Sequence, residues 1–475
     1  MVAVTSSVIE VEVSCGLPDE IDLVVPRKPG PERSSQRYEA DGAMTDPHRL
    51  SAAQAASLIS AGRLTSEELV RSCLDRIGER DGAVGAWEFL DPDLALRAAR
   101  QRDGERPRGP LHGVPIGIKD IVDTADLPTA CGSPIYAGRR PADDAACVRR
   151  LRDAGAVIIG KTVTTEFALF RPGRTVNPHD PARTPGGSSS GTAAAVADYH
   201  VPVALGSQTA GSIVRPASFC GVFGLKPTYG SFELSGVKMI SSSLDTLGHL
   251  ARAAEDLAVV AQVLSARGPA GFDLGATSLN GRTPRIGFVR MPEWGRIDPD
   301  ARDRIERAVD RLASQTFVDE IAAPAGFENL AEAQITIMEC EAPRGLEEEW
   351  RRHPDQLSEG LRALLERGNA RPPETYRDAQ RVAGECRGRI GELFRDVDVV
   401  LAPSVLGEAP AGLDTTGDPL LCRAWTLLGT PAVAVPGLLG ADGLPLGVQV
   451  VAPPGEDATA LAAARWLAPR LAGEG

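Results

Sequence analysis

The sequence lacks the cysteine and histidine spacings that hold metal ions or build disulfide frameworks. Its eight cysteines include no C-x-x-C pair, and its six histidines show no pairing at helical spacing. We therefore expect no zinc site, no other metal, no cofactor and no disulfide framework. Reduced cysteines are typical of the cytoplasm, where we expect the protein to act.

Long apolar runs and an excess of basic residues are missing as well. No apolar stretch approaches the roughly 18 residues of a membrane span, and the N-terminus lacks the basic and apolar regions of a secretory signal. With 64 acidic and 51 basic side chains the net charge is -13, which argues against a nucleic-acid-binding groove. We expect neither a membrane nor a nucleic acid as a partner.

Apolar residues are plentiful: 43% of the 475 residues are hydrophobic, enough for a sizeable core. Ser51 and Thr65 each open a capping box in front of an amphipathic pattern. Asp143 or Asp144 is expected to cap a later helix, and residues 156–160 are typical of a buried strand. This alternation predicts an α/β fold with a sheet covered by helices, in one large domain.

Residues 1–47 are expected to form an N-terminal extension of the main domain at 48–475. Residues 8–13, VIEVEV, alternate as an edge strand does, and residues 26–43 have the proline, glycine and charge content of a linker. The extension either lies over the main domain or contributes to a homodimer contact; both alternatives stay open.

Residues 183–216, RTPGGSSSGTAAAVADYHVPVALGSQTAGSIVRP, hold two turns rich in glycine and serine around a run of small apolar residues. Glycine permits unusual backbone angles and close approach, and serine supplies a hydroxyl that can attack a carbonyl or relay a proton. The two turns together predict a serine nucleophile.

The first turn, GGSSSG, has three other interpretations. A flexible linker is disfavoured because alanine-rich, helix-forming residues follow. A phosphate-binding loop would need a lysine where Thr192 stands. A nucleophile elbow at Gly187, Ser189 and Gly191 lacks the apolar strand that should precede it.

A third motif lies upstream at residues 113–120, GVPIGIKD, which reads as a short apolar strand with a lysine at its end. In this order the three motifs resemble those of the amidase signature family of serine hydrolases, and the likeness runs from about residue 50 to about residue 460. It implies a single large domain with a central mixed β-sheet covered on both faces by helices. The likeness fades between about 285 and 395, where we expect the variable region that shapes the substrate pocket.

Position by position, the resemblance implies that Lys119 is the catalytic base and that Ser212 is the nucleophile. It implies that Ser188, which would follow a cis peptide bond from Gly187, relays the proton between them. Ser189 would help to hold the lysine and the relay serine.

The chemistry of such a site sets requirements of its own. A lysine accepts a proton only when it is neutral, so burial must lower the pKa of Lys119 from about 10.4 towards 7–8, and no carboxylate should lie close to it. Lys119 would then draw a proton through Ser188 from Ser212, which attacks the amide carbonyl. Ser188 would pass the proton to the leaving amine, and water would hydrolyse the acyl-enzyme.

The oxyanion hole is expected to consist of consecutive backbone N–H groups, those of Thr209, Ala210, Gly211 and Ser212. One position departs from the family pattern. Gln208 stands where many members have an aspartate, which leaves open how this loop is held.

Two further residues invite a catalytic role. Lys161 follows a predicted strand and is a second candidate base, but it lies outside the lysine motif and we interpret it as structural. Asp245 is either a catalytic acid or an acceptor for backbone N–H groups in a turn, and the second is favoured because buried polar groups need partners. Nothing in the histidine positions favours a Ser-His-Asp triad.

Arg215 is the first charged residue after the predicted nucleophile. Because Pro216 disfavours an α conformation in the preceding residue and suits the first position of a helix, we expect Arg215 just outside that helix. The favoured interpretation is that Arg215 pairs with a remote acid or with carbonyl groups. The alternative is that it binds a carboxylate of the substrate.

Three functions follow from these residues. The leading one is a cofactor-independent amidase, a hydrolase that cleaves a non-peptide C–N bond in a small-molecule amide. The alternative is the glutamine-hydrolysing subunit of a tRNA-dependent amidotransferase, which resembles the same family and passes ammonia to partner subunits. A non-catalytic binding protein is disfavoured because Lys119, Ser188 and Ser212 are all present.

Overall fold

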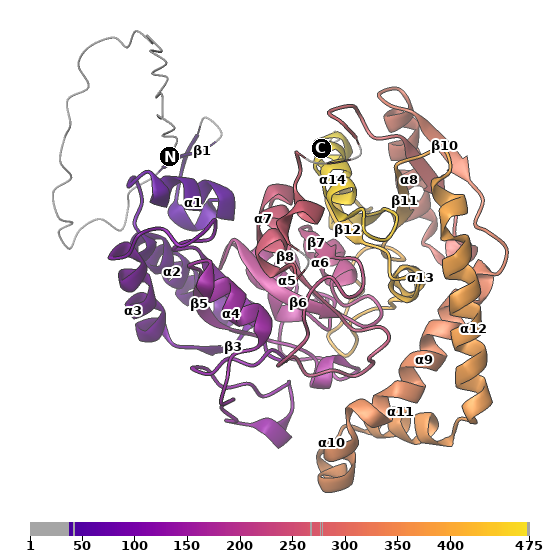
Figure 1. Ribbon diagram of the computed structural model, residues 1–475, viewed down its shortest axis with the longest axis horizontal. Helices are drawn as coiled ribbons and strands as arrows, with labels where there is room; N and C mark the ends of the chain where they lie inside the picture. Colours follow the sequence, from indigo (N-terminus) through magenta and orange to yellow (C-terminus); the bar gives the residue numbers. More distant parts are fainter. Residues whose placement is uncertain (1–37, 41–42, 267, 276, 278, 473–475) are drawn as a thin grey trace, which may run out of the picture. The chain divides into compact units, whose positions relative to one another are not determined.

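The computed structural model describes residues 38–472 apart from 41, 42, 267, 276 and 278 (Figure 1). The edge strand expected at residues 8–13 lies outside the described residues, as does most of the expected linker. The end of that linker forms an antiparallel pair of short strands, β1 (Tyr38–Ala40) and β2 (Ala43–Thr45).

One large sheet of eleven strands runs through the described residues. Its strands, in the order in which they pair, are β10 (Val318–Ile321), β9 (Ile286–Val289), β11 (Val399–Pro403), β13 (Pro445–Val451), β12 (Ala432–Leu439), β7 (Phe223–Lys226), β8 (Thr246–Ala251), β6 (Val203–Gln208), β4 (Pro115–Lys119), β5 (Val157–Thr162) and β3 (Trp87–Leu90).

The α-helices are α1 (Ala52–Ser60), α2 (Ser66–Val84), α3 (Pro92–Asp103), α4 (Ala146–Asp153), α5 (Ser190–Ala197), α6 (Val214–Cys220), α7 (Ala254–Leu264), α8 (Pro299–Ala313), α9 (Leu330–Gly345), α10 (Glu347–Arg352), α11 (Glu359–Ala370), α12 (Pro373–Arg389), α13 (Leu420–Leu428) and α14 (Asp457–Leu471). Short 3-10 helices lie at η1 (Pro47–Arg49), η2 (Pro134–Tyr136), η3 (Glu166–Ala168), η4 (Pro269–Phe272), η5 (Pro292–Arg296), η6 (Phe327–Asn329), η7 (Pro354–Gln356) and η8 (Ile390–Phe394). In this part of the chain no helix has both the length and the apolar character that a membrane span needs.

The sheet is mixed, as the resemblance implied. Strand β4 runs parallel to β5 and β6, whereas β8 runs antiparallel to both β6 and β7. Because β4 and β6 are parallel neighbours, their last residues, Lys119 and Gln208, lie at the same edge of the sheet. The predicted lysine and the loop with the predicted nucleophile therefore meet there.

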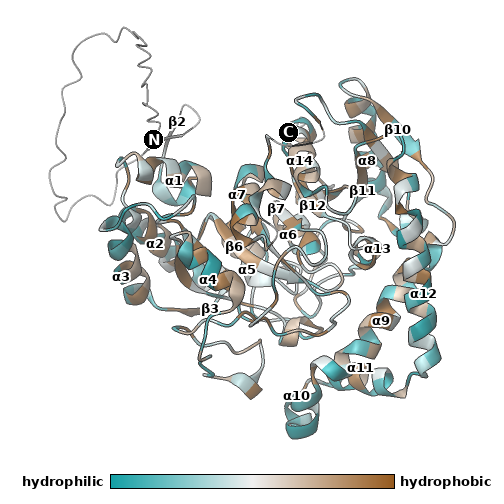
Figure 2. Ribbon diagram, in the orientation of Figure 1, coloured by the Kyte–Doolittle hydropathy of each residue, from teal (hydrophilic) through white to brown (hydrophobic). Residues whose placement is uncertain are grey.

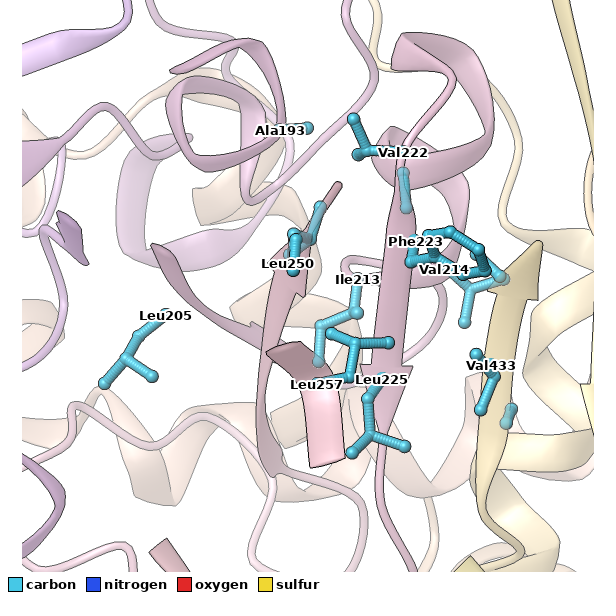
Figure 3. Packing of buried hydrophobic residues seen from close by; sticks show 14 of the residues in the cluster. Ala193, Leu205, Ile213, Val214, Val222, Phe223, Leu225, Leu250, Leu257 and Val433 are labelled. Atoms are coloured by element: carbon cyan, nitrogen blue, oxygen red, sulfur yellow. The ribbon is translucent and has the colours of Figure 1, made fainter. Parts of the chain in front are cut away.

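Helices pack on the sheet in pairs that also contact each other. Helices α5 and α6 contact each other, and α5 packs on β6 while α6 packs on β12. Helices α7 and α14 also contact each other, and α7 packs on β8 while α14 packs on β12. Figure 3 shows part of the core between these layers, with Ile213, Leu225 and Leu257 gathered around β7 and β8. Figure 2 shows hydrophilic residues along α10 and much of α12, which belong to the region that we expected to be variable. The predicted fold class, a mixed sheet covered on both faces by helices, is confirmed.

The capping predictions had different outcomes. Both capping boxes are present: Ser51 caps α1 and Thr65 caps α2, each with its reciprocal bond from the third helical residue. The prediction for the helix near residue 145 is wrong, because α4 follows Ala145 and has no side-chain cap. The carboxylate of Asp144 instead accepts a hydrogen bond from the backbone of Ala125 and pairs with a side chain of α4 itself.

Candidate active site

Lys119 ends strand β4, and its side chain is completely buried, with 0% exposed. Its Nζ donates hydrogen bonds to Oγ of Ser188 at 2.7 Å and to Oγ of Ser207 at 2.9 Å. Burial lowers the pKa of Lys119 to about 7, against a smaller opposing effect of the charge on Asp245. Within the described part of the chain, no carboxylate forms an ion pair with it. At neutral pH a large share of this lysine is therefore uncharged and able to accept a proton.

The first serine turn holds Ser188 against the lysine. The peptide bond between Gly187 and Ser188 is cis. A Cβ at Gly187 would lie 2.7 Å from Cγ2 of Thr416, and Gly186, with φ +81°, would place a Cβ 2.8 Å from Cα of Pro216. Both glycines are needed because the turn passes this close to its neighbours.

Ser189 forms no hydrogen bond with Lys119 among the described residues, so any support that it gives to the lysine is indirect. Its Oγ accepts a hydrogen bond from the backbone N–H of Ser207 and donates one to the carbonyl of the same residue, both at 3.3 Å. It therefore fixes the strand β6 position from which Ser207 reaches Lys119. Sequence reasoning missed Ser207, although the pairing of β4 with β6 would have placed it near the lysine.

Ser212 lies between β6 and α6, and 8% of it is exposed. The next residue, Ile213, is fully buried and anchors this loop on the sheet. A Cβ at Gly248 would lie 2.7 Å from the Ile213 side chain, and a Cβ at Gly224 would lie 3.2 Å from it. The absence of a side chain at these two strand positions therefore leaves space for Ile213. Among the described residues, a hydrogen bond joins Lys119 to Ser188, but none joins Ser188 to Ser212.

Residues 209–212 present backbone donors, and the carbonyls of the first two are bound by side chains of other helices. In the described portion of the chain, none of their four N–H groups donates to a protein acceptor. The carbonyl of Thr209 accepts a hydrogen bond from Nε2 of Gln334 on α9 at 2.9 Å, and that of Ala210 accepts one from Oγ1 of Thr426 on α13 at 2.7 Å. This arrangement leaves the N–H groups available to a negatively charged oxygen, as an oxyanion hole requires.

Gln208 shows how the loop is held without the aspartate common at this position. It is buried, and its Oε1 accepts hydrogen bonds from the backbone N–H groups of Ile213 at 2.9 Å and Val214 at 3.0 Å. Its Nε2 donates to Oγ1 of Thr426 at 2.9 Å. An amide supplies both an acceptor and a donor here, so one side chain fixes the start of α6 and connects it to α13.

Asp245 serves the turn role that the sequence favoured. Its Oδ2 accepts hydrogen bonds from the backbone N–H groups of Ile240 at 2.6 Å and Ser241 at 3.0 Å. Its Oδ1 accepts one from Oγ1 of Thr209 at 2.6 Å, which is a link to the nucleophile loop that the sequence did not reveal. Burial raises the pKa of Asp245.

Lys161 is occupied elsewhere, in agreement with a structural role. Its Nζ donates to the carbonyl of Val122 and to Oγ1 of Thr129, both at 2.6 Å, and lies 3.7 Å from the carboxylate of Asp120. Burial lowers the pKa of Lys161 to about 8, but its described hydrogen bonds reach none of the serines of the two turns.

Arg215 lies inside helix α6, so the expectation that it stands outside the helix is wrong. Pro216 occupies the third helical position, where the missing N–H would have had no partner within the helix, and the helix can therefore begin before it. The guanidinium of Arg215, of which 4% is exposed, donates to the carbonyls of Gly417 at 2.9 Å and Gly187 at 2.6 Å and to Oγ1 of Thr416 at 3.0 Å. Burial lowers its pKa to about 10. The carbonyl interpretation thus describes its contacts, which join α6 to the turn of the relay serine.

Helix α9, which lies in the stretch predicted to be variable, contacts the site. Besides Gln334, it contributes Glu341, whose carboxylate accepts hydrogen bonds from Oγ of Ser241 at 2.6 Å and from the hydroxyl of Tyr376 at 2.6 Å. Gln334 and Thr426 were both missed by sequence reasoning, because nothing local marks a residue that contacts a loop more than 100 positions away. Over the residues described, no cluster of His, Cys, Asp and Glu has the composition of a metal site.

Comparison with known proteins places the chain in a family. The family model described as Amidase matches residues 68–461. One subunit of the glutamyl-tRNA(Gln) amidotransferase of Anaeromyxobacter dehalogenans is 36% identical over 88% of this chain and 96% of that protein. The corresponding protein of Acidothermus cellulolyticus is 36% identical over 86% and 92%. A crystal structure of an amidase superposes with a TM-score of 0.81 at 32% identity, covering 89% of this chain and all of that one.

These relatives correct the leading function expected from the sequence. A free-standing amidase for a small-molecule amide is contradicted, because relatives at this identity over most of the chain are amidotransferase subunits. The sequence could not separate the two functions, since both use the same three motifs. What stands is the coarser statement that the chain is an amidase-type enzyme.

Proposed function

Since the chain belongs to the Amidase family, we propose that it is the glutamine-hydrolysing subunit of a tRNA-dependent amidotransferase. In this function it cleaves the side-chain amide of glutamine, which is a non-peptide C–N bond, and passes the ammonia to partner subunits. The observation that carries the proposal is the 36% identity to a glutamyl-tRNA(Gln) amidotransferase subunit over 88% of this chain and 96% of that protein. Such a subunit works in the cytoplasm, where charged tRNA is present.

The proposed chemistry assigns one role to each of three residues. Lys119, buried and with a pKa lowered to about 7 by burial, accepts a proton from Ser188, to which it is hydrogen-bonded. Ser188 in turn accepts the proton of Ser212, whose oxygen forms a bond to the amide carbon. The C–N bond breaks as Ser188 returns a proton to the nitrogen, and ammonia leaves.

The second half of the reaction restores the enzyme. Water attacks the ester between Ser212 and the glutamyl group, with Lys119 and Ser188 now accepting its proton, and glutamate leaves. In both halves the oxyanion binds to N–H groups of residues 209–212, and Gln334 and Thr426 hold the carbonyls of the first two of these residues. Loss of one such donor typically costs about 3–4 kcal/mol of transition-state stabilisation.

The charge of the chain agrees with a division of labour between subunits. A net charge of -13 does not favour direct binding of RNA, so partner subunits contact the tRNA and this chain supplies ammonia.

The test measures ammonia release from glutamine labelled with ¹⁵N in its side-chain amide. We expect release by the purified chain, and an increase when partner subunits, ATP and glutamylated tRNA are added. Lys119→Met and Ser212→Ala serve as inactive controls. If the chain with its partners releases no ammonia from glutamine but cleaves other primary amides, the proposed function is wrong.

A further inference from the structure

Helix α13 lies directly against the loop of the proposed nucleophile. A Cβ at Gly211 would lie 2.9 Å from Cβ of Pro419 and 3.1 Å from Cβ of Cys422, so the start of α13 leaves no space at that point. One turn further on, Thr426 donates its hydroxyl to the carbonyl of Ala210. The face of α13 formed by residues 422 and 426 therefore packs against the loop of residues 209–212.

Arg423 follows Cys422 on this helix and reaches the same loop through one side chain. Its Nη1 donates to Oε1 of Gln334, whose Nε2 donates to the carbonyl of Thr209. The guanidinium is thus one amide group away from the backbone of the proposed oxyanion hole.

The guanidinium of Arg423 has hydrogen-bond donors that no described protein acceptor uses. It forms no ion pair with an acid in the part of the chain that the structure describes, and Gln334 is its one hydrogen-bond acceptor there. Arg423 is partly exposed, whereas Arg215 is buried and both of its Nη atoms donate to protein carbonyls or a hydroxyl. Burial lowers the pKa of Arg423, and the acids whose charges act on it, such as Asp418 and Glu339, form no ion pair with it. An arginine held on one side and free on the other is suited to a carboxylate, which it binds through two parallel hydrogen bonds.

We infer that Arg423 binds the carboxylate of the substrate and so selects primary amides that carry one, as glutamine does. The inference rests on the proposed function for the identity of the substrate. The Gln334 contact ties the arginine to the carbonyl of Thr209, so a carboxylate bound by Arg423 belongs to a molecule that lies next to the loop of Ser212. Arg423 acts as a specificity residue and takes no part in proton transfer.

The experiment compares three amides on wild type, Arg423→Met and Arg423→Lys. Glutamine and glutaramic acid carry a carboxylate, and pentanamide is neutral and of similar length. For Arg423→Met we expect kcat/KM to fall about 30-fold or more on both carboxylated amides, mainly through KM, and to change less than about threefold on pentanamide. Arg423→Lys keeps the charge but loses the paired donors, so it should lie between wild type and Arg423→Met.

Arg387→Met is the matched control, because Arg387 also donates to α13, at the carbonyl of Leu427. It should affect all three amides equally. If Arg423→Met lowers kcat/KM equally on all three, Arg423 merely orients Gln334 and the inference is overturned. If Arg423→Met does not fold, Arg423→Lys decides by the same comparison.

The outcomes separate this inference from the proposed function. Hydrolysis of glutaramic acid but not of glutamine, with the preference over pentanamide lost in Arg423→Met, leaves the inference standing and refutes glutamine as the substrate. If the wild type hydrolyses glutamine but does not prefer carboxylated amides to pentanamide, glutamine stands as the substrate and the inference about Arg423 is refuted.

Discussion

The pH dependence of amide hydrolysis should follow the ionisation of Lys119. Only the neutral amine can accept the proton that Ser188 draws from Ser212, and burial lowers the pKa of this lysine to about 7. With that value about 9% of the lysine is neutral at pH 6 and about 91% at pH 8, so kcat/KM should rise about tenfold between them and then level off.

The size of the rise distinguishes a buried lysine from an ordinary one. With an unshifted pKa of about 10.4, the neutral fraction would increase about a hundredfold between pH 6 and pH 8 and would still be increasing at pH 9. The assay is ammonia release at substrate concentrations well below KM, from pH 5.5 to 9, with circular dichroism at each pH to show that the fold is unchanged. A solvent isotope effect confirms that proton transfer limits the rate.

Two results would refute this reasoning. A flat profile across the neutral range, with chemistry limiting, would mean that Lys119 is not the base. A profile that climbs tenfold per pH unit up to pH 9 would mean that the lysine keeps its ordinary pKa in spite of its burial. Lys119→Met, which removes the base without adding charge, should be inactive across the whole pH range.

Three other predictions concern the supports of the site. Gly186→Ala should lower the free energy of unfolding by about 1–3 kcal/mol, because φ is +81° there and the new Cβ would lie 2.8 Å from a backbone atom of α6. Urea denaturation measures this, and an unchanged midpoint would contradict it. Thr426→Val removes the hydrogen bonds to Ala210 and Gln208, so kcat should fall at least about tenfold with little change in KM. A change in KM alone would mean that Thr426 does not support the oxyanion loop. Arg215→Met should reduce kcat/KM equally on glutamine and on pentanamide, because its contacts are with the protein, and a loss confined to glutamine would restore its role as a carboxylate ligand.

The residues that the sequence could identify are those whose surroundings are local. The apolar strand that ends at Lys119 was predictable from its own residues, whereas the catalytic role of this lysine came from the resemblance and stays a prediction. The capping boxes at Ser51 and Thr65 were predictable because all their partners lie within three residues. The run of glycine and serine predicted a turn at residues 186–191, but the choice of Ser188 within it came from the resemblance and stays a prediction.

The residues that the sequence could not identify act across long separations. Gln334 contacts Thr209 across 125 positions, and Thr426 contacts Ala210 across 216. Such contacts depend on how α9 and α13 pack, which no local pattern encodes. The error at Arg215 has a different cause: the local preference imposed by the following proline was weaker than the gain from burying the first turn of α6.

The central claim is that Ser212 becomes acylated by the amide that the protein cleaves. The most direct measurement is to quench the enzyme with acid during turnover of glutamine, digest it and locate the γ-glutamyl group by mass spectrometry. We predict the group on Ser212, its absence in Ser212→Ala, and no accumulation in Lys119→Met. A glutamyl group on Ser189 or on a cysteine of the wild-type protein would contradict the claim.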